Sequence, residues 1–312
     1  MSEDFSPDDD LPPGDDLFPG FTAHWIDTEG GRLFARAGGP DDGPPLLLLH
    51  GFPQTHACWH RIAPALARTH RVVCLDLKGY GWSAAPGGDA RHEAYSKRVL
   101  AREAVEAMEQ LGHIRFRVAG HDRGARVGYR MALDTPGRVE RLALLDIFPT
   151  LLQWQRIEAG TIPARHWATQ AEPAPGPETE IGRDPIPYFD GLLAGWTRTK
   201  SLDAFDARAL AAYRAGVNEP SRIHAFCEDY RAGATRDREQ DVEDLAAGRR
   251  IEVPVLVLTG SSYLTAGGGE TALQAWRRTF APGAIGEEVE SGHFLAEENA
   301  AATLAALQRF LG

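Results

Sequence analysis

Short apolar runs alternate with segments of helical spacing up to Asp146. Two runs, 23–28 and 33–37, flank a Glu-Gly-Gly turn and predict an antiparallel strand pair. The runs 46–49 and 72–75 are continuously apolar, as in strands buried on both faces of a parallel sheet, and further strands are predicted at 116–119 and 142–145. Between them, helices are predicted at residues 63–68, 96–111 and 126–133, with Gly112 as a C-cap after the second. This order predicts a doubly wound, mostly parallel α/β sheet flanked by helices.

The alternation stops after Asp146 and returns only near the C-terminus. Residues 147–250 are rich in tryptophan, proline and helix-forming residues, with loop signals around Pro173. A further strand is predicted at 253–258 and a closing helix at 304–310. We therefore predict an α/β core formed by residues 17–146 and 251–312, interrupted by a helical cap at 147–250.

Composition places the chain among ordinary soluble globular proteins. It has 312 residues, of which 43% are hydrophobic and 25% are charged. No apolar run approaches the roughly 18 residues that a membrane helix requires. The N-terminal stretch is acidic and proline-rich, whereas a secretion signal needs basic and apolar regions. These features predict a cytoplasmic protein.

The negative charge is concentrated at the N-terminus. Residues 1–16 contain seven of the acidic residues and no lysine or arginine, against a net charge of −11 for the whole chain. We predict that this segment is a disordered acidic tail. The small remaining charge argues against binding to nucleic acid or to an acidic membrane. Cys58, Cys74 and Cys227 lack the paired spacing of a metal or redox site, so buried thiols and no metal are expected.

A candidate nucleophile lies where the predicted strand 116–119 turns into a helix. The turn reads Gly-His-Asp-Arg-Gly at residues 120–124, with small residues at both ends and Asp122 at the centre. This is the context of a nucleophile elbow, in which serine is more usual. An aspartate that attacks a saturated carbon leaves an ester that water can hydrolyse, so halides and epoxides are the expected electrophiles. The alternative is that Asp122 only caps the following helix.

Hydrolysis of such an ester needs a base, an acid that orients the base, and an oxyanion hole. His293 has the late position in the chain that the order nucleophile, acid, histidine requires. The loop after strand 253–258 contains no carboxylate, so the predicted acid is Asp146, which follows strand 142–145. The alternative is that Asp146 has a purely structural role. The backbone amides of Phe52 and Arg123 are the predicted oxyanion donors.

Several longer blocks resemble the fluoroacetate (haloacetate) dehalogenases of the α/β-hydrolase superfamily. They read HGFPQTHACWHRIAP, DLKGYGWS, GHDRGARVGYRMALDTPGRVERLALLDIFPT, RHW with PAP downstream, CEDYRAGA and ESGHFL. The resemblance extends over nearly all of the chain from Leu17 onward. It implies an α/β-hydrolase fold with an inserted helical cap, a small haloacid as substrate, no cofactor, and a homodimer.

The resemblance also implies roles for individual residues. Arg123 and Arg126 would bind the substrate carboxylate, and guanidinium groups match a carboxylate geometrically. One of them could instead be an ordinary helix-surface residue. In the cap, the resemblance implies a halide site whose N–H and O–H donors come from His166, Trp167 and Tyr230, with Trp196 lining the same cavity. Without the resemblance, Trp167, Tyr230 and Trp196 would be read as packing residues of the cap.

The sequence therefore predicts hydrolysis of 2-haloacids to hydroxyacid and halide. The chain departs from the family's pattern at Arg165 and at residues 267–269, which is expected to affect pocket size or polarity. An epoxide hydrolase is the alternative enzyme, and its acid groups would come from tyrosines of the cap: Tyr188, Tyr213 and Tyr230. A noncatalytic binding protein on the same fold is the alternative of a different class.

Overall fold

The computed structural model describes residues 17–162, 165–264 and 269–312. The predicted acidic tail and residues 267–268 lie outside these ranges. Within the part described, no helix combines the length and the apolar character needed to cross a membrane.

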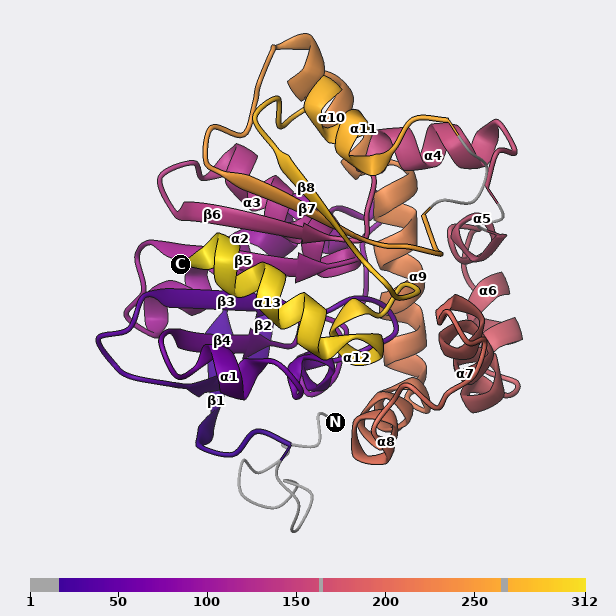
Figure 1. Ribbon diagram of the computed structural model, residues 1–312. Coiled ribbons are helices and arrows are strands. Elements are labelled where there is room, and N and C mark those ends of the chain that lie inside the picture. Colours follow the sequence, from indigo (N-terminus) through magenta and orange to yellow (C-terminus); the bar gives the residue numbers. More distant parts are fainter. Residues whose placement is uncertain (1–16, 163–164, 265–268) are drawn as a thin grey trace.

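A single eight-stranded sheet forms the centre of the fold (Figure 1). Its strand order is β1-β2-β4-β3-β5-β6-β7-β8. The first two pairings, β1 with β2 and β2 with β4, are antiparallel, and the others are parallel. The strands are β1 Phe21–Thr28, β2 Gly31–Gly38, β3 Pro45–Leu49, β4 Arg71–Leu75, β5 Phe116–His121, β6 Val139–Leu145, β7 Val255–Gly260 and β8 Ile285–Val289.

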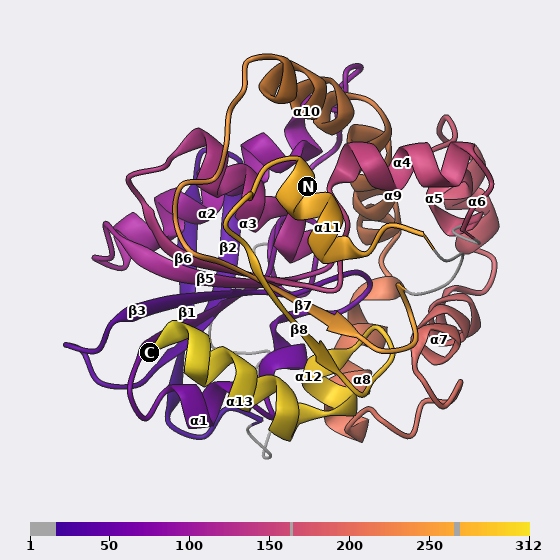
Figure 2. The same ribbon diagram turned by 45° about the horizontal axis from the view of Figure 1, so that its top comes forward.

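Helices cover both faces of the sheet (Figures 1 and 2). Alternate residues of β3 point into two different cores: Leu47 and Leu49 into the core beneath α2 and α3, and Leu46 and Leu48 into the core beneath α1 and α13. This two-sided burial explains the continuous apolar runs. The core helices are α1 Ala63–Leu66, α2 Lys97–Gln110, α3 Arg123–Asp134, α11 Ala272–Arg278, α12 Leu295–Glu298 and α13 Ala300–Leu311, with two short 3₁₀ helices, η1 His56–Trp59 and η2 Glu93–Tyr95.

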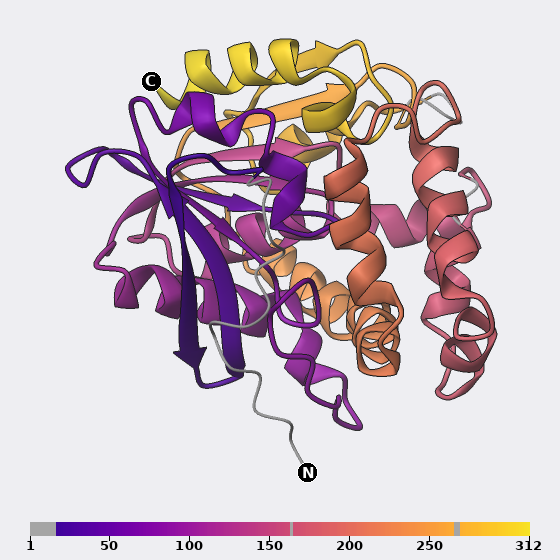
Figure 3. The same ribbon diagram turned by 90° about the horizontal axis from the view of Figure 1, so that it is seen from below.

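In the described residues between β6 and β7, the segment predicted as a cap, the structure has seven helices. They are α4 Thr150–Glu158, α5 Arg165–Gln170, α6 Gly176–Ile181, α7 Pro185–Trp196, α8 Ala207–Val217, α9 Pro220–Ala234 and α10 Arg236–Ala246. Helix α9 contacts α5, α6, α8 and α10. Figure 3 shows this group beside the ends of the central strands, where ligands bind in open α/β sheets.

The predicted elements are present, with shifted ends. Helix α1 is a single turn and stops at Leu66, and β7 begins at Val255, after Pro254, rather than at residue 253. Ser96 caps α2 by accepting a hydrogen bond from the Val99 amide, and Gly112 adopts a φ of +87° just beyond its end. Strand β8 was not predicted. The three cysteines are buried free thiols, as expected.

Candidate active site

Asp122 occupies the sharp turn between β5 and α3. Its backbone has φ +45° and ψ −112°, an uncommon conformation for a residue other than glycine. A Cβ atom on Gly120 would lie 2.5 Å from the Gly124 carbonyl oxygen, and one on Gly124 would lie 2.3 Å from the Leu49 carbonyl oxygen. The turn thus depends on glycine at both positions. The Asp122 side chain makes no capping bond to α3, so it does not serve as a helix cap.

The loop after β3 brings a backbone amide to the carboxylate. The Phe52 N–H donates to Oδ2 of Asp122 at 3.1 Å. A Cβ on Gly51 would lie 2.7 Å from the Cβ of Asp122, so glycine permits this close approach. Arg123 is the first residue of α3, where a backbone N–H has no acceptor within its own helix. Of the two predicted oxyanion donors, the Phe52 amide contacts the carboxylate of Asp122, and the Arg123 amide belongs to the next residue in the chain.

Asp146 and His293 form a buried pair on two neighbouring loops. Nδ1 of His293 lies 2.6 Å from Oδ2 of Asp146, and the Gly260 amide donates to Oδ1 at 2.9 Å. Burial raises the pKa of Asp146, and the hydrogen bond with His293 opposes that shift. The His293 amide also donates to the Trp196 carbonyl at 2.9 Å, which links the histidine loop to the cap. With Nδ1 held by Asp146, Nε2 is the ring atom left to act on water.

The electrostatics of the pocket keep Asp122 ionised. Burial opposes its ionisation, but interactions with the neighbouring His293, Arg123 and Arg126 outweigh burial and hold the pKa of Asp122 below its usual range. Burial, reinforced by the charge of Arg123, lowers the pKa of His166 to about 3. His166 is therefore a neutral imidazole with one N–H at ordinary pH.

The two arginines after the nucleophile are both buried, so neither is a helix-surface residue. Arg126 lines the pocket, and its Nη1 donates to the Phe148 carbonyl at 3.2 Å and to the Thr150 hydroxyl at 3.0 Å. Arg123 is 0% exposed and is not among the pocket-lining residues. Its guanidinium interacts with the hydroxyl of Tyr230 and forms an ion pair with Asp229, whose carboxylate lies 3.8 Å from Nε.

Three side chains of the cap form a compact group around the arginines. The ring centroids of His166, Trp167 and Tyr230 are 5.5–6.4 Å apart. The guanidinium carbon of Arg123 lies 3.5 Å from the Tyr230 ring centroid and 4.4 Å from that of Trp167, and that of Arg126 lies 4.6 Å from Trp167. These contacts hold both cations against aromatic faces.

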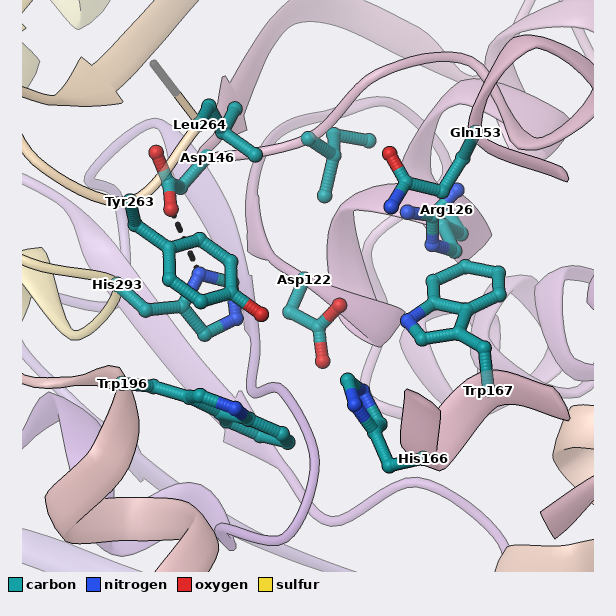
Figure 4. A pocket seen from close by; sticks show the side chains of 11 residues that line it. Asp122, Arg126, Asp146, Gln153, His166, Trp167, Trp196, Tyr263, Leu264 and His293 are labelled. Carbon is teal, nitrogen blue, oxygen red and sulfur yellow. Dashed lines mark hydrogen bonds and ion pairs between the residues drawn. The ribbon is translucent and has the colours of Figure 1, made fainter. Parts of the chain in front are cut away.

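A small pocket lies between the core and the cap (Figure 4). Of the predicted residues, it is lined by Asp122, Arg126, Asp146, His166, Trp167, Trp196 and His293. Arg123, Tyr230 and Phe52 are not among the lining residues. Figure 4 shows His166 and Trp167 on one side of Asp122, with His293 and Tyr263 on the other. The little space that these side chains leave favours a small substrate.

Sequence reasoning missed four residues of the lining: Ile147, Gln153, Tyr263 and Leu264. The signal for Tyr263 is that this loop, which follows strand β7 and contains no carboxylate, does contain a phenol.

Other residues singled out in the sequence lie elsewhere. Arg165 is exposed at the start of α5 and does not line the pocket, so the effect expected of it is not seen. The Tyr188 hydroxyl accepts from Gln170, and the Tyr213 hydroxyl donates to Glu297; neither tyrosine lines the pocket. Among the described residues, no group of histidines, cysteines and carboxylates is arranged to hold a metal ion.

Comparison with known proteins agrees with this arrangement. The family profile of the alpha/beta hydrolase fold matches residues 44–300. A fluoroacetate dehalogenase from Burkholderia sp is 45% identical over 248 residues, which are 79% of this chain and 80% of that protein. The chain belongs to the fluoroacetate (haloacetate) dehalogenase family of the α/β-hydrolase superfamily.

This chain is also similar to proteins that are not named as dehalogenases. A soluble epoxide hydrolase from Corynebacterium sp. (strain C12) is 31% identical over 274 residues, 82% of this chain and 86% of that protein. The crystal structure of an α/β hydrolase from Nostoc sp PCC 7120 is 44% identical, with a TM-score of 0.87 and coverage of 93% of this chain and 98% of that one. The superfamily assignment therefore implies a hydrolase, and the substrate has to be argued from the site.

Proposed function

We propose that this protein hydrolyses 2-haloacids such as fluoroacetate to a hydroxyacid and a halide ion. The observation that carries the proposal is Arg126, which lines the pocket with a buried Nε that has no hydrogen-bond partner among the described residues, beside the elbow aspartate and the buried Arg123. A buried cation with unsatisfied donors is costly unless an anion completes its environment. A substrate carboxylate supplies that anion, whereas a plain haloalkane does not.

In the first step, Asp122 displaces the halide. Arg123 and Arg126 bind the substrate carboxylate and offset its repulsion from the Asp122 carboxylate. An oxygen of Asp122 attacks the α-carbon, the carbon–halogen bond breaks, and the bonding pair leaves with the halide. The product of this step is an ester between Asp122 and the acid.

The departing halide needs hydrogen-bond donors as its charge forms. His166, Trp167 and Tyr230 carry an imidazole N–H, an indole N–H and a phenol O–H. Because His166 is neutral, it offers one N–H without adding a full charge to the site. Fluoride is a poor leaving group, so its release depends most strongly on these donors.

In the second step, water hydrolyses the ester. His293, oriented by Asp146, takes a proton from the water, whose oxygen attacks Cγ of Asp122. The Phe52 amide, which contacts Oδ2 in the resting site, stabilises the oxyanion together with the Arg123 amide. The bond between Cγ and the substrate oxygen then breaks, and the hydroxyacid leaves with an oxygen that came from Asp122.

The test combines halide release with detection of the ester. Wild-type protein should release fluoride, chloride and bromide from the corresponding haloacetates on ion-selective electrodes, and Asp122→Ala should release none. Intact-mass spectrometry of His293→Asn should detect one carboxymethyl group on the peptide that contains residue 122. In water labelled with oxygen-18, the hydroxyacid of a first turnover should be unlabelled. A labelled first product, or no adduct, would refute the covalent route.

Epoxide hydrolysis is a second candidate, favoured by the pocket phenol of Tyr263 and by the similarity to the Corynebacterium enzyme. A phenol near Asp122 could donate a proton to the oxygen of an opening epoxide. The two functions are separated by measuring diol formation from styrene oxide beside halide release from haloacetates. Because an epoxide carries no anion for Arg123, we expect haloacids to be strongly preferred.

A further inference from the structure

Tyr263 is a pocket residue to which the steps above assign no role. It lies in the loop after β7 and lines the pocket together with Asp122 and His293. In Figure 4 its hydroxyl points toward Asp122, on the side of the carboxylate that faces His293. No described residue forms a hydrogen bond with this hydroxyl, although Tyr188 and Tyr213 both have such partners.

The local structure holds Tyr263 in this place. Its ring centroid lies 4.2 Å from that of His293, with an angle of 33° between the rings, and 6.2 Å from that of Trp196. The two preceding residues are hydrogen-bonded to the segment that leads to His293: the Ser261 amide to the Val289 carbonyl, and the Ser262 amide to the Ser291 carbonyl. The loops that carry Tyr263 and His293 are therefore tied together.

The charge state of the phenol suits a neutral hydrogen-bonding role. Burial, followed by the negative charges of Asp122 and Asp146, raises the pKa of Tyr263 well above its usual value. The hydroxyl thus stays protonated at working pH. It can accept one hydrogen bond and donate another, but it cannot serve as a general base.

We propose that Tyr263 is a further catalytic residue, which holds the hydrolytic water in the second half-reaction of the proposed dehalogenation. The inference rests on that proposed function. The water donates one hydrogen to Nε2 of His293 and the other to the Tyr263 oxygen. These two hydrogen bonds direct a lone pair of the water oxygen toward Cγ of Asp122. The covalent changes are those of ester hydrolysis: the water oxygen bonds to Cγ, the bond from Cγ to the substrate oxygen breaks, and His293 passes the proton to that oxygen.

This role predicts that Tyr263→Phe affects only one half of the cycle. Phenylalanine keeps the ring that packs on His293 and removes the hydroxyl. Loss of one hydrogen bond to the water should slow ester hydrolysis about tenfold. Alkylation of Asp122 should be unaffected, because it takes place before the water acts.

The experiment is rapid-quench kinetics with bromoacetate, in which halide release and the mass of the intact protein are followed together. For Tyr263→Phe we expect a halide burst of one equivalent per site at the wild-type rate, a slower steady state, and a larger fraction of esterified enzyme than in wild type. Tyr188→Phe, which removes a phenol outside the pocket, is the matched control and should behave as wild type. Thermal melting of both variants checks that they are folded.

The outcomes separate this inference from the proposed function. A slower burst without accumulated ester would place Tyr263 on the substrate or the nucleophile and overturn its role with water. Unchanged kinetics in both phases would also overturn it. If wild-type protein released no halide from any haloacetate, the proposed function itself would fail, and the inference with it.

Discussion

The core wall and the cap wall of the pocket hold their side chains in different ways. The core wall consists of Asp122, Asp146 and His293, which lie on tight turns after strands and are fixed by backbone geometry and short hydrogen bonds. The cap wall consists of His166, Trp167 and Trp196, which lie on helices and are fixed by ring packing.

Under the proposed function, this difference gives the two walls separate tasks. Bond making and ester hydrolysis need atoms at defined distances, and strand ends with strained turns provide such rigid positions. Selection of the leaving group needs donors around a small anion, and a packed aromatic group provides these without a strained backbone. We therefore expect changes in the core wall to abolish activity, and changes in the cap wall to alter which halide is released.

We expect the largest effect on activity and stability when one methyl group is added at Gly124, in the turn that holds Asp122. In Gly124→Ala the new Cβ would lie 2.3 Å from the Leu49 carbonyl oxygen, so the elbow cannot keep its geometry. We expect loss of all halide release and a loss of stability of about 3 kcal/mol or more, measured by urea unfolding. Gly191→Ala in cap helix α7, where the Cβ meets open space, should leave stability unchanged or slightly higher. Equal effects of the two substitutions would contradict the contrast between the walls.

Arg123 is part of core helix α3, but its side chain packs against aromatic rings of the cap. We expect its substitution to have the second largest effect on activity. Arg123→Lys replaces a planar fork with a point charge and removes the stacking on Tyr230. We expect kcat/KM for fluoroacetate to fall about 100-fold or more, because the substrate carboxylate loses its matched donors. The control is Arg130→Lys on the same helix, where the buried guanidinium faces Asp244. If both variants kept wild-type kcat/KM, Arg123 would not bind substrate.

The core wall could be predicted from the sequence better than the cap wall. The reason is that local turns fix the side chains of the core wall, whereas packing between distant segments fixes those of the cap wall. A nucleophile elbow is a local feature, since the glycines and the strand before Asp122 are contiguous in the sequence. The stacking of Arg123 on rings from two cap helices depends on packing between distant segments, so the sequence pattern alone could not place it. Only the family resemblance pointed to Trp167 and Tyr230. Strand β8 was missed because its first four residues are exposed and two of them are glutamates, which hides the apolar run of a buried strand.

A third prediction tests the cap wall directly. Trp167→Phe keeps an aromatic ring beside both arginines and removes the indole N–H, which faces Asp122 in Figure 4. We expect fluoride release to fall about tenfold or more, and bromide release by less than about threefold, because fluoride depends more on hydrogen bonding as it departs. Parallel electrode assays with fluoroacetate and bromoacetate measure the ratio.

The matched control for this prediction is Trp154→Phe. Trp154 packs edge-on against Trp167 at 5.3 Å but does not line the pocket. The control should lower both rates equally, if at all. Equal loss of fluoride and bromide release in Trp167→Phe would instead assign Trp167 to packing.

The smallest expected effect concerns a contact between the core and the cap outside the two walls. Here Glu297 of α12 accepts hydrogen bonds from Tyr213 of cap helix α8 and from Gln54. Burial raises the pKa of Glu297 from 4.5 to about 8. The folded protein therefore keeps a proton that the unfolded chain releases above pH 4.5, and stability should fall as the pH rises toward 8, by at most about 1.4 kcal/mol per pH unit.

Glu297→Gln removes this titration while keeping the shape of the side chain, so its stability should decline less than that of wild type over the same range. Urea unfolding at pH 5.5, 7.0 and 8.5 measures the difference, with the exposed Glu180→Gln as control. Other buried carboxyls, such as Asp241, titrate in both proteins and cancel in the comparison. Parallel stability curves for wild type and Glu297→Gln would show that Glu297 is ionised throughout, and that the contact between core and cap carries a buried charge rather than a neutral acid.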